Sequence, residues 1–540
     1  MERRLEIAVR WLLGPESASA ERPAHLWPRW IFLRALGLIY FSAFYSLLFQ
    51  IKGLIGPGGI LPADDYLQAV STAIHSGRFW FAPTLLWLGA SDHALALLCW
   101  VGLAASLLLV LNVWPRAALV VSFVCFLSFV SAAQDFANYQ SDGMLLEAGF
   151  LALFFAPPGL RPGLGRAHRP SRASRFLLQW EWFRIYFESG VVKIASGDFS
   201  WRHFTAMDDY YQNGPLPTWI GWHVQHFPHW FHASTVFLTL GTELVLVWMF
   251  LLPRRFRIAC FWFVTPFQIA IILGANYTFL NYLVLSLGFL LLDDRFVEWI
   301  LPPRIRDLIG GRQALAEAGE TRAEGWRARW RRQLEPVRMV ASGVCLGMIF
   351  YVTTAQLVWY VFPQIRLPLM ERSMKALAPF RVANAYGLFA VMTHARYEIE
   401  FQGSFDGQTW TAYPFRYKPQ DPYKAPGIYA PYQPRFDWNL WFASLGSWPQ
   451  YRFVIWTEER LLQNEPDVLA LFAGDPFAGT PPRRVRAVIY QYWFTDAKTK
   501  REEGLWWRRE FLGEYAPSLQ REPDGKIAVL GFPAGPARSP

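Results

Sequence analysis

Long apolar windows recur along the first two thirds of this chain, and they restrict its fold more than any other feature. Several are nearly uncharged and reach the roughly 20 residues that a helix needs to cross a bilayer core of about 30 Å. Of the 540 residues, 53% are hydrophobic and only 17% are charged, unlike a soluble globular protein. The sequence therefore predicts a multi-pass α-helical membrane domain.

The pattern of apolar and basic segments predicts about nine spans. They are assigned to residues 30–51, 94–111, 117–133, 144–156, 176–196, 232–252, 258–274, 279–292 and 337–362. With this assignment, the strongly basic loops lie on one side of the membrane, and the loops rich in Gly, Pro, Trp and acidic residues lie on the other. Since basic loops remain cytoplasmic, we expect the N-terminus inside and the chain after the ninth span outside.

This topology predicts five segments. They are a cytoplasmic N-terminal segment (1–29), a membrane domain with spans 1–8 (30–292), a charged cytoplasmic loop (293–336), span 9 (337–362) and an extracytoplasmic domain (363–540). The last segment contains no window that could span a membrane. Tyr397–Phe401 alternates as a strand does, Asp406-Gly407 supplies a turn, and Trp410–Tyr417 and Arg484–Phe494 are further strand candidates. We expect an antiparallel β domain, with a sandwich as its form.

The net charge of +10 does not indicate a nucleic-acid partner, because the arginines gather in short segments between apolar windows. The four cysteines lie inside apolar windows without metal-ligand spacing, so neither a disulfide framework nor a metal site is predicted. A group of histidines in one outer loop is interpreted as interfacial rather than metal-binding: His203, His223, His226, His229 and His232. The sequence carries none of the recognisable nucleophile, phosphate-binding, dinucleotide-binding or zinc-protease motifs, and we expect no cofactor.

Charged side chains interrupt the apolar stretch Gln179–Trp201. Glu181, Arg184 and Glu188 fall at i, i+3 and i+7, on one stripe of a helix, and Lys193 follows. Charges at bilayer depth usually face the bundle interior and pair. The predicted polar core comprises Arg34, Asp142, Glu147, Glu181, Arg184, Glu188 and Lys193. Two interpretations stay open: a paired network that fixes helix register, or a catalytic site that uses Glu181, Glu188 and Lys193.

A second set of candidates lies in the C-terminal part, where large aromatics surround a possible Arg/Asp pair. The set is Trp410, Arg435, Asp437, Trp438, Trp441 and Phe442. Trp and Arg often anchor protein interfaces, so these residues are candidates for binding a client protein. Aromatic side chains in a β domain also form its core, and this alternative stays open.

Several long motifs resemble the lipase maturation factor family from about Trp30 to Pro517. In the membrane part they are LRALGLIYFSAFYSLLFQIKGLIGPGGILPA, DFANYQSDGMLLEAGFLALFFAP and WEWFRIYFESGVVKIASGDFSW. In the tail they are NAYGLFAVMTHARYEIEFQGSFDGQTW, APYQPRFDWNLWFASL and RVRAVIYQYWFT. The resemblance implies a multi-pass protein whose animal members lie in the endoplasmic reticulum membrane and help secreted lipases to reach an active, assembled state.

The resemblance thus implies a chaperone for a secreted lipase or another exported client, in the endoplasmic reticulum of a eukaryote or the plasma (inner) membrane of a bacterium. No KDEL-like signal closes the chain and its tail has no cysteine, features that fit a bacterial member. The membrane part also resembles the transmembrane module of vitamin K-dependent carboxylases at Tyr186, Gly190, Lys193 and Trp201. That resemblance implies an alternative, a membrane enzyme acting with a lipid-soluble cofactor or substrate.

Overall fold

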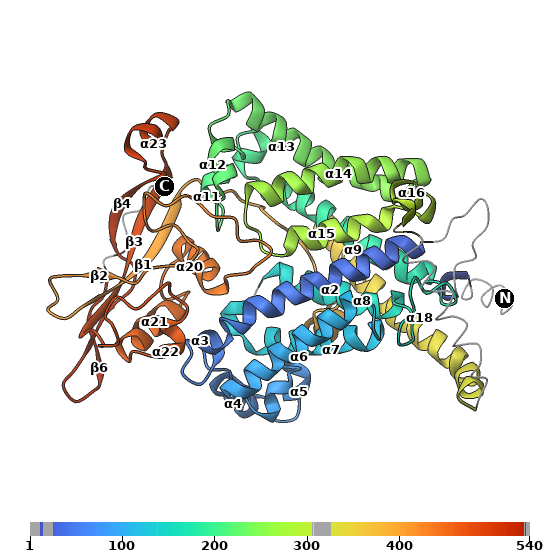
Figure 1. The fold of residues 1–540 in the computed structure, drawn as a ribbon, viewed down its shortest axis with the longest axis horizontal. Coiled ribbons are helices and arrows are strands. Elements are labelled where there is room, and N and C mark those ends of the chain that lie inside the picture. Colours follow the sequence, from blue (N-terminus) through green and yellow to red (C-terminus); the bar gives the residue numbers. More distant parts are fainter. Residues whose placement is uncertain are drawn as a thin grey trace.

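A computed structural model of the chain describes residues 11–14, 25–137, 139–304, 306, 326–533 and 535. A bundle of long helices forms one part of the molecule and an antiparallel sheet forms the opposite end (Figure 1). The short helices α20 and α21 lie between them, so the sheet meets the bundle through a helical layer (Figure 1).

The bundle is built from nine long segments in the described part of the chain. They are α2 (Leu26–Leu48), α6 (Asp92–Val110), α7 (Pro115–Ala132), α8 (Gln140–Phe155), α9 (Arg172–Ala195), α13 with η3 (His229–Leu244 and Leu246–Leu251), α14 (Arg254–Gly274), α15 with η4 (Leu280–Gly288 and Phe289–Leu291) and α18 (Trp326–Val361). Short helices connect them: α3 (Ile51–Ile55), α4 (Ala63–Ala73), α5 (Arg78–Phe81), η1 (Leu85–Leu88), η2 (Gln134–Ala137), α10 (Phe199–Arg202), α11 (Tyr210–Asn213), α12 (Trp219–Gln225), α16 (Asp294–Ile300), α19 (Met370–Leu377) and η5 (Ala378–Phe380).

Six of the described helices are long and apolar enough to cross a membrane: Leu26–Leu48, Asp92–Val110, Pro115–Ala132, His229–Leu251, Arg254–Gly274 and Glu335–Val361. A shorter apolar helix covers Leu280–Leu291. The predicted multi-pass membrane domain is confirmed, whereas the count of about nine spans is not. The two remaining segments differ from ordinary spans because α8 has only 16 residues and α9 is interrupted by charges.

Helix α9 is the central element of the bundle and packs against α8, α13, α15 and α18. The Ser171 hydroxyl caps its first turn by accepting the N–H of Ser174. Gly190 lies where α9 meets α13, and a Cβ atom there would come within 2.8 Å of Leu244 and 2.9 Å of the Glu243 Cβ. The missing side chain therefore allows the two helices to approach closely.

The sheet contains six antiparallel strands in the described part of the chain, in the order β2-β1-β3-β5-β6, with β4 also paired to β3. Their bounds are β1 (Arg396–Ser404), β2 (Thr411–Ala412), β3 (Arg484–Phe494), β4 (Trp507–Glu514), β5 (Ser518–Arg521) and β6 (Ile527–Gly531). The central pair β1 and β3 is in register from Arg396 opposite Tyr492 to Ser404 opposite Arg484. The predicted strands at 397–401 and 484–494 are confirmed.

Helices rather than a second sheet cover one face of this sheet among the described residues. They are α20 (Arg435–Leu445) and α21 (Phe453–Leu462), followed by α22 (Pro466–Leu469); α23 (Ala497–Glu503) lies further along the chain. Phe401 of β1 stacks on Phe436 of α20 at a centroid distance of 6.3 Å, inside the common core. The antiparallel β domain is thus confirmed, and its sandwich form is not.

The strand expected at Trp410–Tyr417 is reduced to the two residues of β2. After β2, side chains instead of a neighbouring strand accept the hydrogen bonds of the backbone N–H groups. The N–H of Phe415 donates to Gln420 Oε1 at 2.9 Å, and the N–H of Lys418 donates to Asp437 Oδ1 at 3.1 Å. The chain therefore turns away from β1 after β2.

Candidate functional site

An extended segment of the C-terminal part closes the polar core of the bundle. After η5 the chain at residues 382–388 runs along α8 and α9 without regular structure. The N–H of Asn384 donates to Glu147 Oε2 at 2.9 Å, and its carbonyl accepts from Arg184 at 2.6 Å. The N–H of Tyr386 donates to Glu188 Oε2 at 2.6 Å. Backbone groups of the tail thus satisfy charges that belong to the membrane helices.

Glu147 of α8 and Arg184 of α9 form an ion pair at the centre of this core, and neither side chain is exposed. The Tyr386 hydroxyl donates to Glu147 Oε2 at 2.9 Å, and the Arg184 guanidinium lies 5.3 Å from the centre of the Tyr386 ring. Glu181 is buried beside the same pair. Buried charges require such partners, because removing an unpaired ion from water costs roughly several kcal/mol. These side chains are packed against the tail segment.

Lys193 forms a second pair, with Glu243 of α13. Its ammonium donates to both carboxylate oxygens at 2.8 and 2.9 Å and to the carbonyl of Leu388 at 3.1 Å. The Trp201 ring centre lies 5.1 Å away. Our sequence interpretation missed Glu243, although it is an acid inside an apolar window, and charges inside an apolar window were the signal that pointed to α9.

Arg34 lies apart from these pairs. Its Nε donates to the carbonyl of Leu109 at 3.0 Å, and its guanidinium stacks on Trp30 at 5.4 Å from the ring centre. The predicted polar core is therefore not one cluster. Arg34 is separate from the other charges and links α2 to the end of α6.

Arg435 carries a third buried pair, between the two parts of the molecule. Its guanidinium donates to Asp142 of α8 in a two-pronged arrangement, at 2.7 and 2.8 Å, and to the carbonyl of Phe136 at 2.7 Å. The group is also sandwiched near Phe129 and Tyr139, at 4.8 and 5.5 Å from the ring centres. The possible Arg435/Asp437 pair is not what the structure contains: Arg435 points into the bundle instead.

Asp437 points the other way and accepts the N–H groups of Tyr417 and Lys418 at 3.3 and 3.1 Å. Burial raises the pKa of its carboxyl to about 6, against the opposing effect of these donors and of the Lys418 charge. The carboxylate fixes the turn that follows β2.

The aromatic candidates line the same junction. Trp438 is 8% exposed and packs edge-on against Tyr139 and Tyr277, at centroid distances of 6.3 and 6.1 Å. Phe442 stacks on Tyr139, and the Trp441 indole donates to the carbonyl of Asn213 at 3.0 Å. Trp410 is separate: it lies beneath the Arg486 guanidinium, 4.0 Å from the ring centre.

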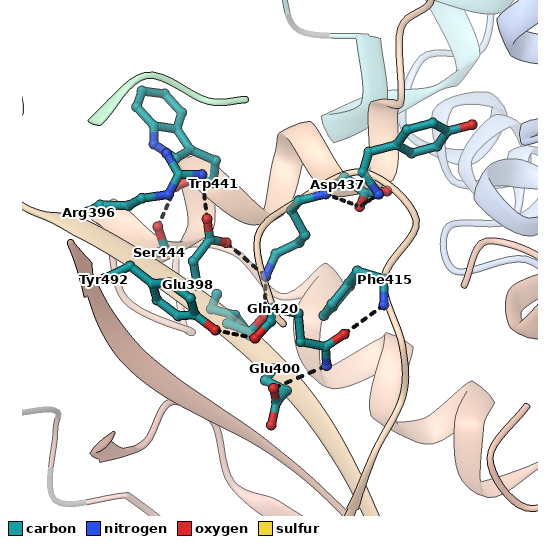
Figure 2. Close-up of polar contacts among 12 residues, drawn as sticks. Arg396, Glu398, Glu400, Phe415, Gln420, Asp437, Trp441, Ser444 and Tyr492 are labelled. Carbon is teal, nitrogen blue, oxygen red and sulfur yellow. Dashed lines mark hydrogen bonds and ion pairs between the residues drawn. The ribbon is translucent and has the colours of Figure 1, made fainter. Parts of the chain in front are cut away.

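A further polar cluster gathers around β1, close to Asp437 and Trp441 of α20 (Figure 2). Figure 2 shows Glu398 beside Arg396, and Gln420 bridging Glu400 and the backbone of Phe415. Glu398 also pairs with the ammonium of Lys418 at 2.8 Å. Arg396 also donates to the carbonyls of Gln212 and Pro215, at 3.0 and 3.1 Å. Gln212 belongs to α11 and Pro215 to the loop that follows it, so this cluster too links the sheet to the membrane domain.

The five histidines do not converge. His203 stacks on Phe199, His226 contacts the carbonyl of Thr495 at 2.9 Å, and His229 pairs with Asp208 at 3.0 Å. His232 is buried in α13, and His223 lies edge-on to Trp222. Within the described ranges, no group of three His, Cys, Asp or Glu side chains gathers as metal ligands would.

Buried ion pairs and aromatic contacts therefore fasten a C-terminal sheet domain onto a helical membrane bundle. Their charged groups point at one another and at backbone groups across the junction. This architecture defines a multi-pass membrane protein whose C-terminal sheet domain is fastened to its helical bundle.

Comparison with known proteins identifies the family. Residues 27–299 match the lipase maturation factor transmembrane domain, and residues 382–517 match the lipase maturation factor C-terminal domain. The second match begins where the tail enters the polar core. The chain belongs to the lipase maturation factor family, as its motifs predicted.

Individual relatives cover nearly the whole chain. Lipase maturation factor 2 of Gallus gallus is 32% identical over 94% of this chain and 83% of its own length. Lipase maturation factor 1 of Bos taurus is 32% identical over 93% of this chain and 91% of its own, and the Homo sapiens protein of that name is 30% identical over 94% and 92%. No solved structure matches the chain.

Proposed function

We propose that this protein is a membrane chaperone that helps a secreted lipase, or a related exported protein, to reach its active state. Family membership supports the class of client. The observation that supports the mechanism is the junction itself: buried contacts fasten the sheet domain to the bundle, and one end of the sheet faces away from the bundle (Figure 1). A client emerging across the membrane would meet this end. We expect the protein in the endoplasmic reticulum membrane of a eukaryote or the inner membrane of a bacterium.

The client surface we propose lies on two strands of this end rather than at the junction. Phe511 of β4 is 51% exposed, and at β6 Leu530 and Phe532 are 47% and 73% exposed. Strand β6 pairs only with β5 among the described strands, so its outer backbone groups are free to pair with an extended client segment. Exposed apolar side chains beside an open strand edge are suited to an incompletely folded protein.

Gene deletion tests the function, with secreted lipase measured both as amount and as activity per molecule. We expect activity per molecule to fall several-fold on deletion and to return with the wild-type gene. The Leu530→Ser/Phe532→Ser variant should restore it poorly. Lys526→Ser, a change at an exposed position of the same hairpin, should restore it fully. Unchanged activity per molecule in the deletion strain would exclude the maturation role, and full rescue by the double variant would exclude this surface.

The alternative enzyme would use Glu181, Glu188 and Lys193 near a lipid-soluble substrate. A specific observation keeps it in view, because Lys193 lines a cavity in the bundle. Glu188 and Lys193 are, however, engaged with Tyr386, Glu243 and Leu388, which favours the chaperone. Lipase maturation that survives Lys193→Met/Glu243→Gln, a change that removes both charges of the pair, would exclude catalysis by Lys193.

A further inference from the structure

A cavity of about 480 Å³ lies inside the membrane bundle, among α9, α13, α14 and α15. This volume is typical of sites for small molecules, which are mostly apolar with a few placed polar groups. Aliphatic and aromatic side chains make up most of the wall, as in those sites. None of the junction pairs except Lys193–Glu243 contributes to it.

The cavity opens sideways, toward the lipid. Three of its lining side chains lie on the outer surface of the bundle: Leu238 of α13, 59% exposed, and Trp262 and Phe263 of α14, 55% and 61% exposed. Both helices belong to the membrane-spanning set. A molecule dissolved in the bilayer can therefore enter without crossing water.

Two polar atoms in the wall have no partner among the described residues. They are Gln268 Oε1 of α14 and Asn281 Nδ2 of α15, on side chains that are each only 5% exposed. The other end of the Gln268 amide is occupied, because its Nε2 donates to the Tyr186 hydroxyl at 2.7 Å. Buried polar groups are nearly always satisfied, so an orphan acceptor and an orphan donor on two residues that line one cavity indicate a ligand. A hydroxyl group can both donate to the first and accept from the second.

Charge in the cavity limits the ligand further. The Lys193 ammonium and the Glu243 carboxylate both reach its wall, paired with each other. Because these two charges are paired with each other, neither is free to neutralise a charged head group, and a charged group buried here would lose its hydration without compensation. A neutral head group avoids this cost.

We propose that this cavity binds a neutral lipid with a free hydroxyl head group and an acyl chain, of the monoacylglycerol class, taken from the bilayer. The hydroxyl head lies at Gln268 and Asn281, and the chain lies against the apolar wall toward α13. This site does not depend on the client surface, since the two are on different parts of the molecule.

Photolabelling of the full-length protein in phosphatidylcholine nanodiscs tests the site. The probe is a monoacylglycerol with a diazirine in its chain, and matched probes are a diazirine fatty acid and a diazirine phosphatidylcholine. We expect saturable labelling of α13–α15 peptides by the monoacylglycerol probe, competed by unlabelled monoacylglycerol. Gln268→Leu and Asn281→Leu should each weaken this binding about two- to tenfold, the range that one hydrogen bond supplies.

Two variants that each add a bulky side chain distinguish binding in the cavity from binding on the lipid-facing surface. Thr239→Phe fills the cavity and should abolish saturable labelling, whereas Ser234→Phe adds the same ring on an exposed position of α13 and should leave it intact. Thermal unfolding identifies misfolded variants, since each scored variant must unfold within a few degrees of wild type without probe. Equal labelling by the fatty acid, or unchanged binding in the leucine variants, would overturn the proposal.

Discussion

One buried ion pair joins the two parts of the chain at the junction. Arg435 and Asp142 are 293 residues apart in sequence, yet both side chains are almost completely buried and form two parallel hydrogen bonds. Replacing such a pair together costs far less than removing one member, because the survivor remains charged and desolvated. The pair therefore specifies how the two parts fit.

Arg435→Met should destabilise the protein by about 3–5 kcal/mol, because it leaves the Asp142 carboxylate buried without a partner. Arg435→Met/Asp142→Leu should recover part of the loss. Arg366→Met, which breaks an exposed pair with Glu371, is the control and should cost no more than about 1 kcal/mol. Unfolding followed by tryptophan fluorescence in detergent measures all three. Equal effects of Arg435→Met and Arg366→Met would contradict the buried bridge.

Asp437 makes the stability depend on pH. Its pKa in the folded protein, about 6, lies above the ordinary 3.8, so the folded protein binds the proton more tightly than the unfolded chain does. The contribution of this group to the free energy of unfolding is therefore fully present below about pH 4 and is lost as the pH rises through 6. Relative to Asp437→Asn, wild type should gain up to about 3 kcal/mol between pH 7 and pH 4. A stability difference that is flat with pH would contradict the shifted pKa.

At the scale of elements, the sequence predicted what depends on local pattern. Long hydrophobic windows identify most membrane helices. The alternation of polar and apolar residues identifies β1 and β3, because burial of one face of a strand makes every second residue apolar. All the charges of the α9 stripe except Glu181 have hydrogen-bond partners among the described residues, but the sequence could not locate those partners. Asn384 lies 200 residues from Arg184 and contributes a backbone carbonyl, which no side-chain pattern records.

The sequence interpretation did not predict the helix α20. Its aromatic residues were interpreted as belonging to a β domain, yet Phe436, Leu440 and Ala443 are buried at i, i+4 and i+7. That spacing is helical, and it outweighs the strand propensity of Trp and Phe. The same helix presents Arg435 and Trp438 to the bundle, so a sequence interpretation without this helix could not predict the junction.

The connection between α18 and α19 should be dispensable once the protein is folded. Residues 363–369 are mostly exposed, whereas the chain beyond them is held by the buried contacts of Asn384, Tyr386 and Arg435. A protease site inserted there and cleaved in detergent should leave both fragments in one gel-filtration peak. The cleaved Arg435→Met variant should separate more readily. Complete separation of the wild-type fragments would contradict a fixed junction.

At the scale of the whole molecule, the proposed function requires the sheet domain to face the compartment through which the client passes. Basic segments support this orientation: the RRFR segment at the start of α14 is predicted to be cytoplasmic, and the sheet lies at the opposite end of the bundle (Figure 1). The chain's four cysteines lie within the helical bundle and can be replaced for labelling experiments.

Single cysteines in a cysteine-free background test this orientation. Lys526 is 85% exposed on its side chain at the β5–β6 turn, and Arg255 is exposed at the start of α14. A membrane-impermeant maleimide added to intact cells or spheroplasts, or to sealed microsomes after selective opening, should label Lys526→Cys only from the extracytoplasmic side. It should label Arg255→Cys only from the cytoplasmic side. Because β6 and the proposed client surface share this turn, cytoplasmic labelling of Lys526→Cys would exclude contact with an exported lipase, whatever the strength of the junction.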